Sequence, residues 1–119
     1  MDADSIEELF AEFGSVAVRR VFGGLGVFAY GLMIALVSGG VIYLKADAPT
    51  IPRFEREGQG PFTDPTKGGT RSIASYWRMP NRLYDDTAEL ARWAQDAHIA
   101  AQRAAVRQRK PPAVRSKCK

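Results

Sequence analysis

The sequence predicts an α+β fold, a two-layer sandwich in which helices pack on an antiparallel sheet. Residues 21–44 carry no charge and are divided by glycines into pieces of strand length. Stretches with helical periodicity precede and follow this run. Consecutive hairpins followed by helices are typical of an antiparallel sheet with helices on one face. The expected order is helix, four strands, helix, one or two strands and a long helix.

The first helix is expected over residues 4–13. Asp4 is a suitable N-cap, and Glu7 stands three residues further on, as in a capping box. Gly14 supplies a C-terminal stop. The apolar residues recur at the spacing of one buried helix face: Ile6, Leu9, Phe10 and Phe13.

The four strands come from residues 16–22 and from the uncharged run. Residues 16–22 alternate in polarity and predict a first strand at an edge of the sheet. Gly31 and the glycines at 39–40 fall where tight hairpin turns need positive φ. The pieces between them are rich in β-branched and aromatic residues. A membrane span is the alternative, because about 20 apolar residues cross a bilayer and a membrane helix tolerates glycine.

The remaining elements follow the uncharged run. Thr50 can cap a short helix over residues 51–56, with Pro52 in its first turn. Residues 61–70 are polar and turn-rich, with Phe62 as an apolar anchor, and residues 71–77 alternate as a returning strand.

The longest helix is expected over residues 85–108. Asp85 or Asp86 can cap it, and both are more simply caps than metal ligands, which need more oxygen donors nearby. His98 lies one residue past the apolar stripe and is expected to be solvated or half-buried rather than a catalytic base. The stripe itself comprises Leu90, Trp93, Ala94, Ala97, Ala101 and Ala104.

Composition predicts one domain over residues 1–108, followed by a tail. A chain of 119 residues that is 45% hydrophobic can bury a single core. Cys118 is the single cysteine, so no internal disulfide and no Cys/His metal cluster can form. We expect no metal, no cofactor and no catalytic residues. The N-terminus is acidic where a signal peptide is basic, which predicts a cytoplasmic protein without membrane association.

Charge is distributed unevenly along the chain. Residues 1–96 have a net charge of −3 and residues 97–119 a net charge of +7. Residues 109–119 hold few apolar groups and are expected to be disordered. Such a basic tail can bind nucleic acid weakly and without sequence preference, or it can simply solubilise the chain. The candidate nucleic-acid-binding residues are Arg107, Arg109, Lys110, Arg115, Lys117 and Lys119.

A second basic cluster depends on the fold. Aromatic side chains beside arginines hold single-stranded nucleic acid. The alternative is that the aromatics pack in the core while the arginines pair with acids. Four arginines in or beside predicted strands would form a patch if they shared a sheet face: Arg19, Arg20, Arg71 and Arg78. The nearby aromatics are Tyr76, Trp77 and Tyr84.

The glycines of Gly23-Gly24-Leu25-Gly26 invite comparison with a phosphate-binding loop. Such a loop needs a helix N-terminus directly after the glycines. Strand-like residues follow here, so a tight turn or a bulge is favoured.

An ordered set of short motifs covers about residues 6–105. The set includes RVFGGLGV at 20–27, GLMIALV at 31–37, LKAD at 44–47, GPF at 60–62, SYW at 75–77, MP at 79–80 and LARWA at 90–94. In this order and spacing the motifs resemble the TfoX N-terminal domain family of bacterial competence regulators. Val21 departs from the methionine that usually precedes Phe-Gly-Gly, and Thr63 stands near where an aromatic often follows Pro-Phe.

The resemblance implies a two-layer α/β domain, which agrees with the element order above. It implies a regulatory or protein-interaction module without catalytic residues. Regulators of this type often carry a second, helical C-terminal domain, for which 119 residues leave no room. We expect an unknown protein partner and a homodimer formed through an exposed edge strand such as 16–22 or 71–77. The alternative function is a nucleic-acid-associated accessory protein that binds through its basic tail.

Overall fold

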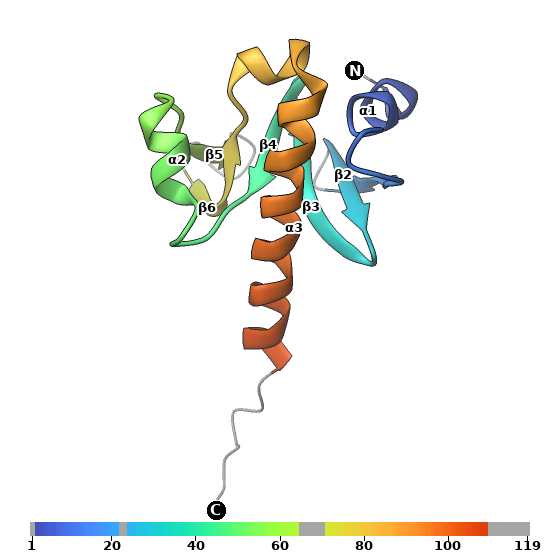
Figure 1. Ribbon diagram of the computed structural model, residues 1–119. Helices are drawn as coiled ribbons and strands as arrows, with labels where there is room; N and C mark the ends of the chain where they lie inside the picture. The colour runs from blue at the N-terminus through green and yellow to red at the C-terminus, as the bar shows by residue number, and fades with distance from the viewer. Residues whose placement is uncertain (1, 22–23, 65–70, 110–119) are drawn as a thin grey trace, which may run out of the picture.

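The structure is a computed structural model that describes residues 2–21, 24–64 and 71–109. It contains six strands and three α-helices, with a 3₁₀ turn before the last helix (Figure 1). In chain order the elements are α1 (Ala3–Leu9), β1 (Ala17–Val21), β2 (Gly24–Ala29), β3 (Leu32–Ser38), β4 (Val41–Lys45), α2 (Ile51–Arg56), β5 (Pro61–Asp64), β6 (Arg71–Arg78), η1 (Asn81–Asp85) and α3 (Thr87–Arg109).

The six strands form one antiparallel sheet in the order β1-β2-β3-β4-β6-β5. The predicted α+β class is therefore confirmed, and so is the edge position of the first strand. The strand at 71–78 is not an edge, because β5 pairs along its outer side. Residues 61–64 form that strand rather than a turn, since Phe62 is buried and packs its ring 4.8 Å from that of Tyr43.

Two neighbouring rows of residues cross the sheet and lie on opposite faces. Cross-strand partners share a face, and successive residues alternate between faces. The first row packs against the helices and consists of Val18, Val27, Ala35, Leu44 and Trp77. The second row, one residue away along each strand, consists of Arg19, Gly26, Leu36, Tyr43 and Arg78.

All the described helices cover the same face of the sheet. α3 lies across β3 and β4, with α1 and α2 on either side of it, and its C-terminal half projects beyond the sheet (Figure 1). Each helix inserts apolar side chains into one continuous core, which includes Ile6, Phe10, Phe54, Leu90 and Trp93. The predicted stripe of α3 is buried as far as Ala101, and Ala104 is half-buried.

The uncharged run forms β2, β3 and β4, as the glycine spacing predicts. Gly31, Gly39 and Gly40 adopt φ of 81°, 60° and 78° in the two hairpin turns. Tyr30 shares the first of these turns with φ of 52°, which is uncommon for a residue with a side chain. Among the described residues, no helix has the length and hydropathy that a bilayer span requires.

The N-terminal cap and the end of α1 differ from the sequence expectation, whereas the cap of α3 agrees with it. The cap of α1 is Asp2 rather than Asp4, because the Asp2 side chain accepts a hydrogen bond of 2.9 Å from the Ser5 N–H. The helix stops at Leu9, several residues before Gly14. Asp86 caps α3 through a hydrogen bond of 3.1 Å from the Glu89 N–H, while Asp85 belongs to η1.

Ion pairs attach the helices to each other and to the end of the sheet. Arg103 on α3 donates to both carboxylate oxygens of Asp47, at 2.7 and 3.0 Å. Arg53 on α2 pairs with Asp96 on α3. Arg82 in η1 binds Glu57 and Glu89, and hydrogen bonds from this guanidinium and from Trp93 lower the pKa of Glu89 to about 2.

Gly24 occupies a place where no other residue fits. A Cβ atom added there would lie 2.2 Å from the main-chain oxygen of Val37, so one strand would have to move. We expect Gly24→Ala to lower the free energy of unfolding by about 1–3 kcal/mol, the usual cost of overpacking. Gly60→Ala is the matched control, since nothing lies within 4 Å of its added Cβ. Equal urea midpoints for the two variants would contradict this prediction.

Asp47 should make the fold sensitive to acid. The hydrogen bond from Arg103 is the main cause that holds the pKa of Asp47 below its ordinary 3.8. A lowered pKa stabilises the fold above the ordinary value, and that contribution is lost as pH falls through the folded-state pKa. We expect the urea midpoint to fall less steeply between about pH 7 and about pH 3 in Asp47→Asn and in Arg103→Gln than in the unmodified chain. Parallel pH profiles in all three proteins would refute it.

Candidate functional site

The sheet face opposite the helices, which we call the open face, is the most distinctive surface of the domain. None of the described helices lies on it. Strands β1 to β4 and β6 contain no acidic residue, and among the described strands only β5 has one, Asp64. The other acids all lie in helices or connections. Charge is therefore segregated by layer, with an excess of cations in the sheet.

The open face combines cations with aromatic rings. The guanidinium carbon of Arg19 lies 4.5 Å from the centre of the Phe28 ring, and the Lys45 ammonium nitrogen lies 4.9 Å from that of Tyr76. Both distances are within the range of cation–π attraction. Arg78 is the cross-strand partner of Tyr43. Each cation thus has an aromatic neighbour on an adjacent strand.

The centre of the open face is apolar. Leu36 is only 1% exposed, although it points away from the helices. Its neighbour Gly26 leaves space that Met33 and Phe28 fill, since a Cβ on this glycine would lie 2.8 Å from Met33 Sδ and 2.9 Å from Phe28 Cε1. The cations therefore stand around an apolar and aromatic floor.

A hollow of about 500 Å³ lies at the β1 end of the open face. Arg19, Phe28 and the 86% exposed Tyr30 contribute to its lining. Its walls include one charged group, and that group is the same guanidinium that rests on Phe28.

A second hollow of about 330 Å³ lies where α3 passes the end of β4. Lys45, Ser75 and Arg107 line it. Burial, and then the charge of Arg107, lower the pKa of Lys45. Asp47 also lines the hollow, but its carboxylate is bound by Arg103. Two cations thus face the same hollow.

The structure brings together part of the cluster predicted from the strands. Arg19 and Arg78 share the open face, whereas Arg20 follows Arg19 directly and points to the opposite side. The backbone of Arg71 lies in β6, but its side chain is outside the described atoms.

The predicted aromatics divide between the two layers. Tyr76 lies on the open face, where burial raises its pKa to about 12. Trp77 belongs to the core, and the Tyr84 hydroxyl accepts a hydrogen bond of 3.0 Å from the Ile42 N–H. Lys45, Phe28 and Tyr43 were not part of the sequence prediction, and the absence of acids from the strands was the signal that could have found them.

The tail candidates lie mostly beyond the described residues. Arg107 is exposed on α3, and Arg109 ends that helix. The other four candidates fall outside the described ranges, as does Cys118. Among the described residues of this group, Arg107 lines the second hollow together with Lys45, a cation that the sequence prediction did not include.

His98 is buried rather than solvated or half-buried. Its side chain lies under Tyr30, with ring centres 5.1 Å apart, and against Phe13 at 6.4 Å. The residue is 8% exposed, and its Nε2 has no hydrogen-bond partner among the described atoms. The positive-φ turn at Tyr30 covers it, which helical periodicity alone could not show.

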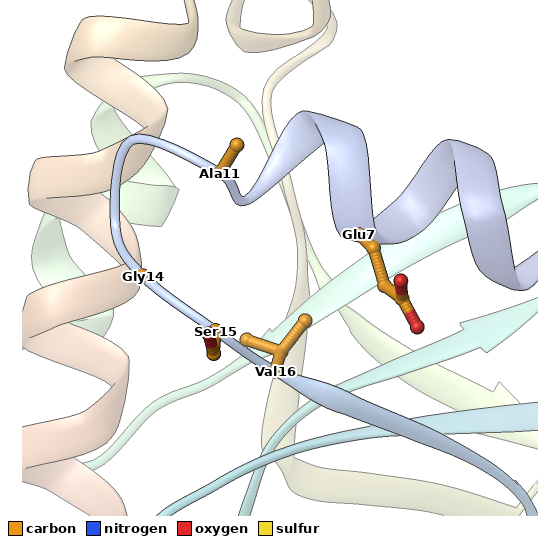
Figure 2. Close-up of a pocket in the computed structure, with 5 residues that line it drawn as sticks. All are labelled: Glu7, Ala11, Gly14, Ser15 and Val16. Atoms are coloured by element: carbon orange, nitrogen blue, oxygen red, sulfur yellow. The ribbon is translucent and has the colours of Figure 1, made fainter.

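A further hollow of about 350 Å³ lies between α1 and the start of β1 (Figure 2). Glu7 is the charged residue in its lining, and Ser15 is accompanied there by no histidine or cysteine. This set of lining residues offers no activated nucleophile. Within the described part of the chain, no three His, Cys, Asp or Glu side chains are grouped as metal ligands.

Comparison with protein-family models matches residues 8–101 to the TfoX N-terminal domain. The chain belongs to this family. The match spans all six strands and most of α3, so the family assignment and the observed fold cover the same part of the chain. A search of curated proteins returned no match.

Both faces of the sheet lie within the TfoX N-terminal domain. The open-face residues Arg19, Tyr43 and Arg78 all fall inside the matched range, whereas Arg107 follows it. The first hollow is therefore part of the family domain, and the second also depends on the end of α3.

Proposed function

We propose that this TfoX N-terminal domain protein is a non-enzymatic regulatory module of the bacterial cytoplasm that binds a partner through its open face. The observation that carries this proposal is the combination of a sheet face left uncovered by the described helices with the absence of acids from five of its strands. The resemblance to competence regulators supports a regulatory role.

Packing on the two sides of the sheet supports the same proposal. The helix-covered face is closed by one continuous apolar core. The open face instead holds the exposed Arg19 and Arg78 beside the half-buried Phe28 and Tyr43. Arginine and aromatic side chains are enriched in the energetically dominant parts of interfaces.

Site-specific photo-crosslinking tests this function even when the partner is unidentified. A photoreactive amino acid replaces Arg78 on the open face or, as the matched control, the exposed Arg92 on α3. We expect irradiation of cells to yield adducts at position 78 and none at position 92, because the partner contacts the open face. Digestion with protease or nuclease then shows the partner's class. Adducts at both positions, or at neither, would count against an interaction through the open face.

We also propose a homodimer through β1. Its outer edge has no partner strand among the described residues, and an unpaired edge can bind a second copy. Arg19 and Arg20 at the centre of this strand would then approach the same residues of the second copy. These like charges would repel each other across the interface, and salt screens their repulsion. Sedimentation should therefore show more dimer at high than at low ionic strength, and a monomer under both conditions at high micromolar concentration would exclude it.

A further inference from the structure

We propose that the open face binds single-stranded nucleic acid, with bases stacked on its aromatic side chains and phosphates held by the cations beside them. This inference rests on the proposed function, since it names the partner class of the same surface. It differs from the expectation that the basic tail carries nucleic-acid contacts, because the residues involved belong to the folded domain.

Charge complementarity is the first argument. Arg19, Lys45 and Arg78 lie on strands that contain no carboxylate, so a ligand's phosphates meet no fixed negative charge on these strands. Neither Arg19 nor Arg78 forms an ion pair among the described residues. Their donors are therefore available for phosphate oxygens, which arginine binds with good geometry.

The pairing of cations with rings is the second argument. The Arg19 guanidinium rests on Phe28, and a stacked guanidinium offers a further flat surface to a base while its edge donates to phosphate. Lys45 and Tyr76 form a second pair of cation and ring on β4 and β6, next to the cross-strand neighbours Tyr43 and Arg78. An acidic peptide would use the cations but gain little from the aromatic faces. Proteins that bind single-stranded nucleic acid combine aromatic side chains, which stack on the bases, with cations that contact the phosphates.

The width of the surface is the third argument. The row from Arg19 to Arg78 crosses five strands, which places its ends about 19 Å apart at the usual strand spacing. The major groove of B-DNA is about 12 Å wide and admits a helix or a two-stranded ribbon. The sheet therefore cannot enter a duplex groove, whereas an unpaired strand can lie across it.

The first hollow lies at the β1 end of this path, and the second lies beside Lys45 where α3, on the other side of the sheet, passes the end of β4. The first, beside Arg19 and Phe28, has the volume of a small ligand and suits an unstacked base. The second places Lys45 and Arg107 around one space and suits a phosphate. Arg107 is exposed near the C-terminal end of α3.

Fluorescence anisotropy with the full-length chain tests the proposal. The probe is a labelled oligothymidylate of about 12 nucleotides, within the range of lengths that known single-strand binding domains cover. A duplex of the same length and a polyglutamate peptide are the comparison ligands. We expect the single strand to bind at least about tenfold more tightly than either at about 50 mM salt.

Arg19→Gln/Arg78→Gln is the first decisive variant. We expect it to weaken binding by at least about tenfold and to flatten the log–log salt dependence by about 1.4, the effect of two lost phosphate contacts on a single strand. Arg56→Gln/Arg92→Gln removes the same charge from exposed positions in the helical layer and should leave binding nearly unchanged.

Phe28→Leu/Tyr43→Leu tests stacking separately from charge. It should weaken binding by at least about tenfold while keeping the salt dependence, because base stacking contributes about 1–3 kcal/mol for each of the two bases and involves no ion release. Circular dichroism checks that the fold is kept. Should this variant unfold, the arginine variant still decides the proposal, because Arg19 and Arg78 are exposed.

Several results would overturn the proposal. Equal or tighter binding of the duplex would show that the face does not select single strands. Equal losses in the two arginine variants would show that only net charge matters. If replacing Lys110, Arg115, Lys117 and Lys119 by glutamine abolishes binding while Arg19→Gln/Arg78→Gln does not weaken it, the tail carries the contact. Binding of polyglutamate without the single strand would make the partner an acidic protein, and the photo-crosslinking result would still stand.

Discussion

The alternation of side chains across the sheet, interrupted by a bulge between β2 and β3 at Val27 and Phe28, is the constraint on which the rest of the structure depends. Val18, Val27 and Trp77 face the helices, and Arg19, Gly26 and Arg78 occupy the next position on the same strands. A register shift of one residue would place guanidinium groups in the core and expose the valines. Because burial of the first row holds the helices to the sheet, it also fixes the second row on the opposite side. Folding and the presentation of the open face are therefore specified by the same residues.

Acidic residues are used where they stabilise the helical layer. Asp86 caps α3, Asp47 anchors Arg103, and Glu89 accepts hydrogen bonds from Arg82 and Trp93. Individual exposed ion pairs contribute little to the free energy of unfolding. The role of these pairs is therefore to position the helices relative to the sheet. The sheet needs no such help, since its main-chain hydrogen bonds and apolar row hold it together. The excess of cations in the strands is thus not balanced by the structural ion pairs.

Much of the fold could be predicted from local sequence signals. Gly31 and the glycines at 39–40 mark both hairpin turns, and the helical spacing from Leu90 to Ala101 marks the buried side of α3. These signals succeed because turn geometry and amphipathic periodicity act over a few residues. Residues 61–64 have the composition of a turn. They form a strand because they pair with β6, and local composition does not encode that tertiary contact. The burial of His98 escapes prediction for the same reason, since the turn that covers it lies far away in the chain.

The open face could be predicted only in part. Arg19 and Arg78 are recognisable as basic residues on strands, but whether they share a face depends on the order and register of the strands between them. The absence of acids from the strands draws attention to Phe28, Tyr43 and Lys45, but alternation alone does not say which face of the sheet the helices cover. Once the sheet order is known, the pairing of neighbouring strands identifies them directly.

The separation of charge by layer has a consequence for how the domain meets other molecules. Acids concentrate in the helices and connections, and cations exceed acids in the strands, so the described sheet carries more positive charge than the described helical layer. Such a separation of charge turns a protein in the field of a charged molecule before contact and raises the fraction of productive encounters. The effect weakens beyond a Debye length of about 8 Å at physiological ionic strength. A polyanion would therefore be drawn to the cations of the strands, and the net charge of +7 over residues 97–119 adds a second centre of attraction at the C-terminal end of the chain.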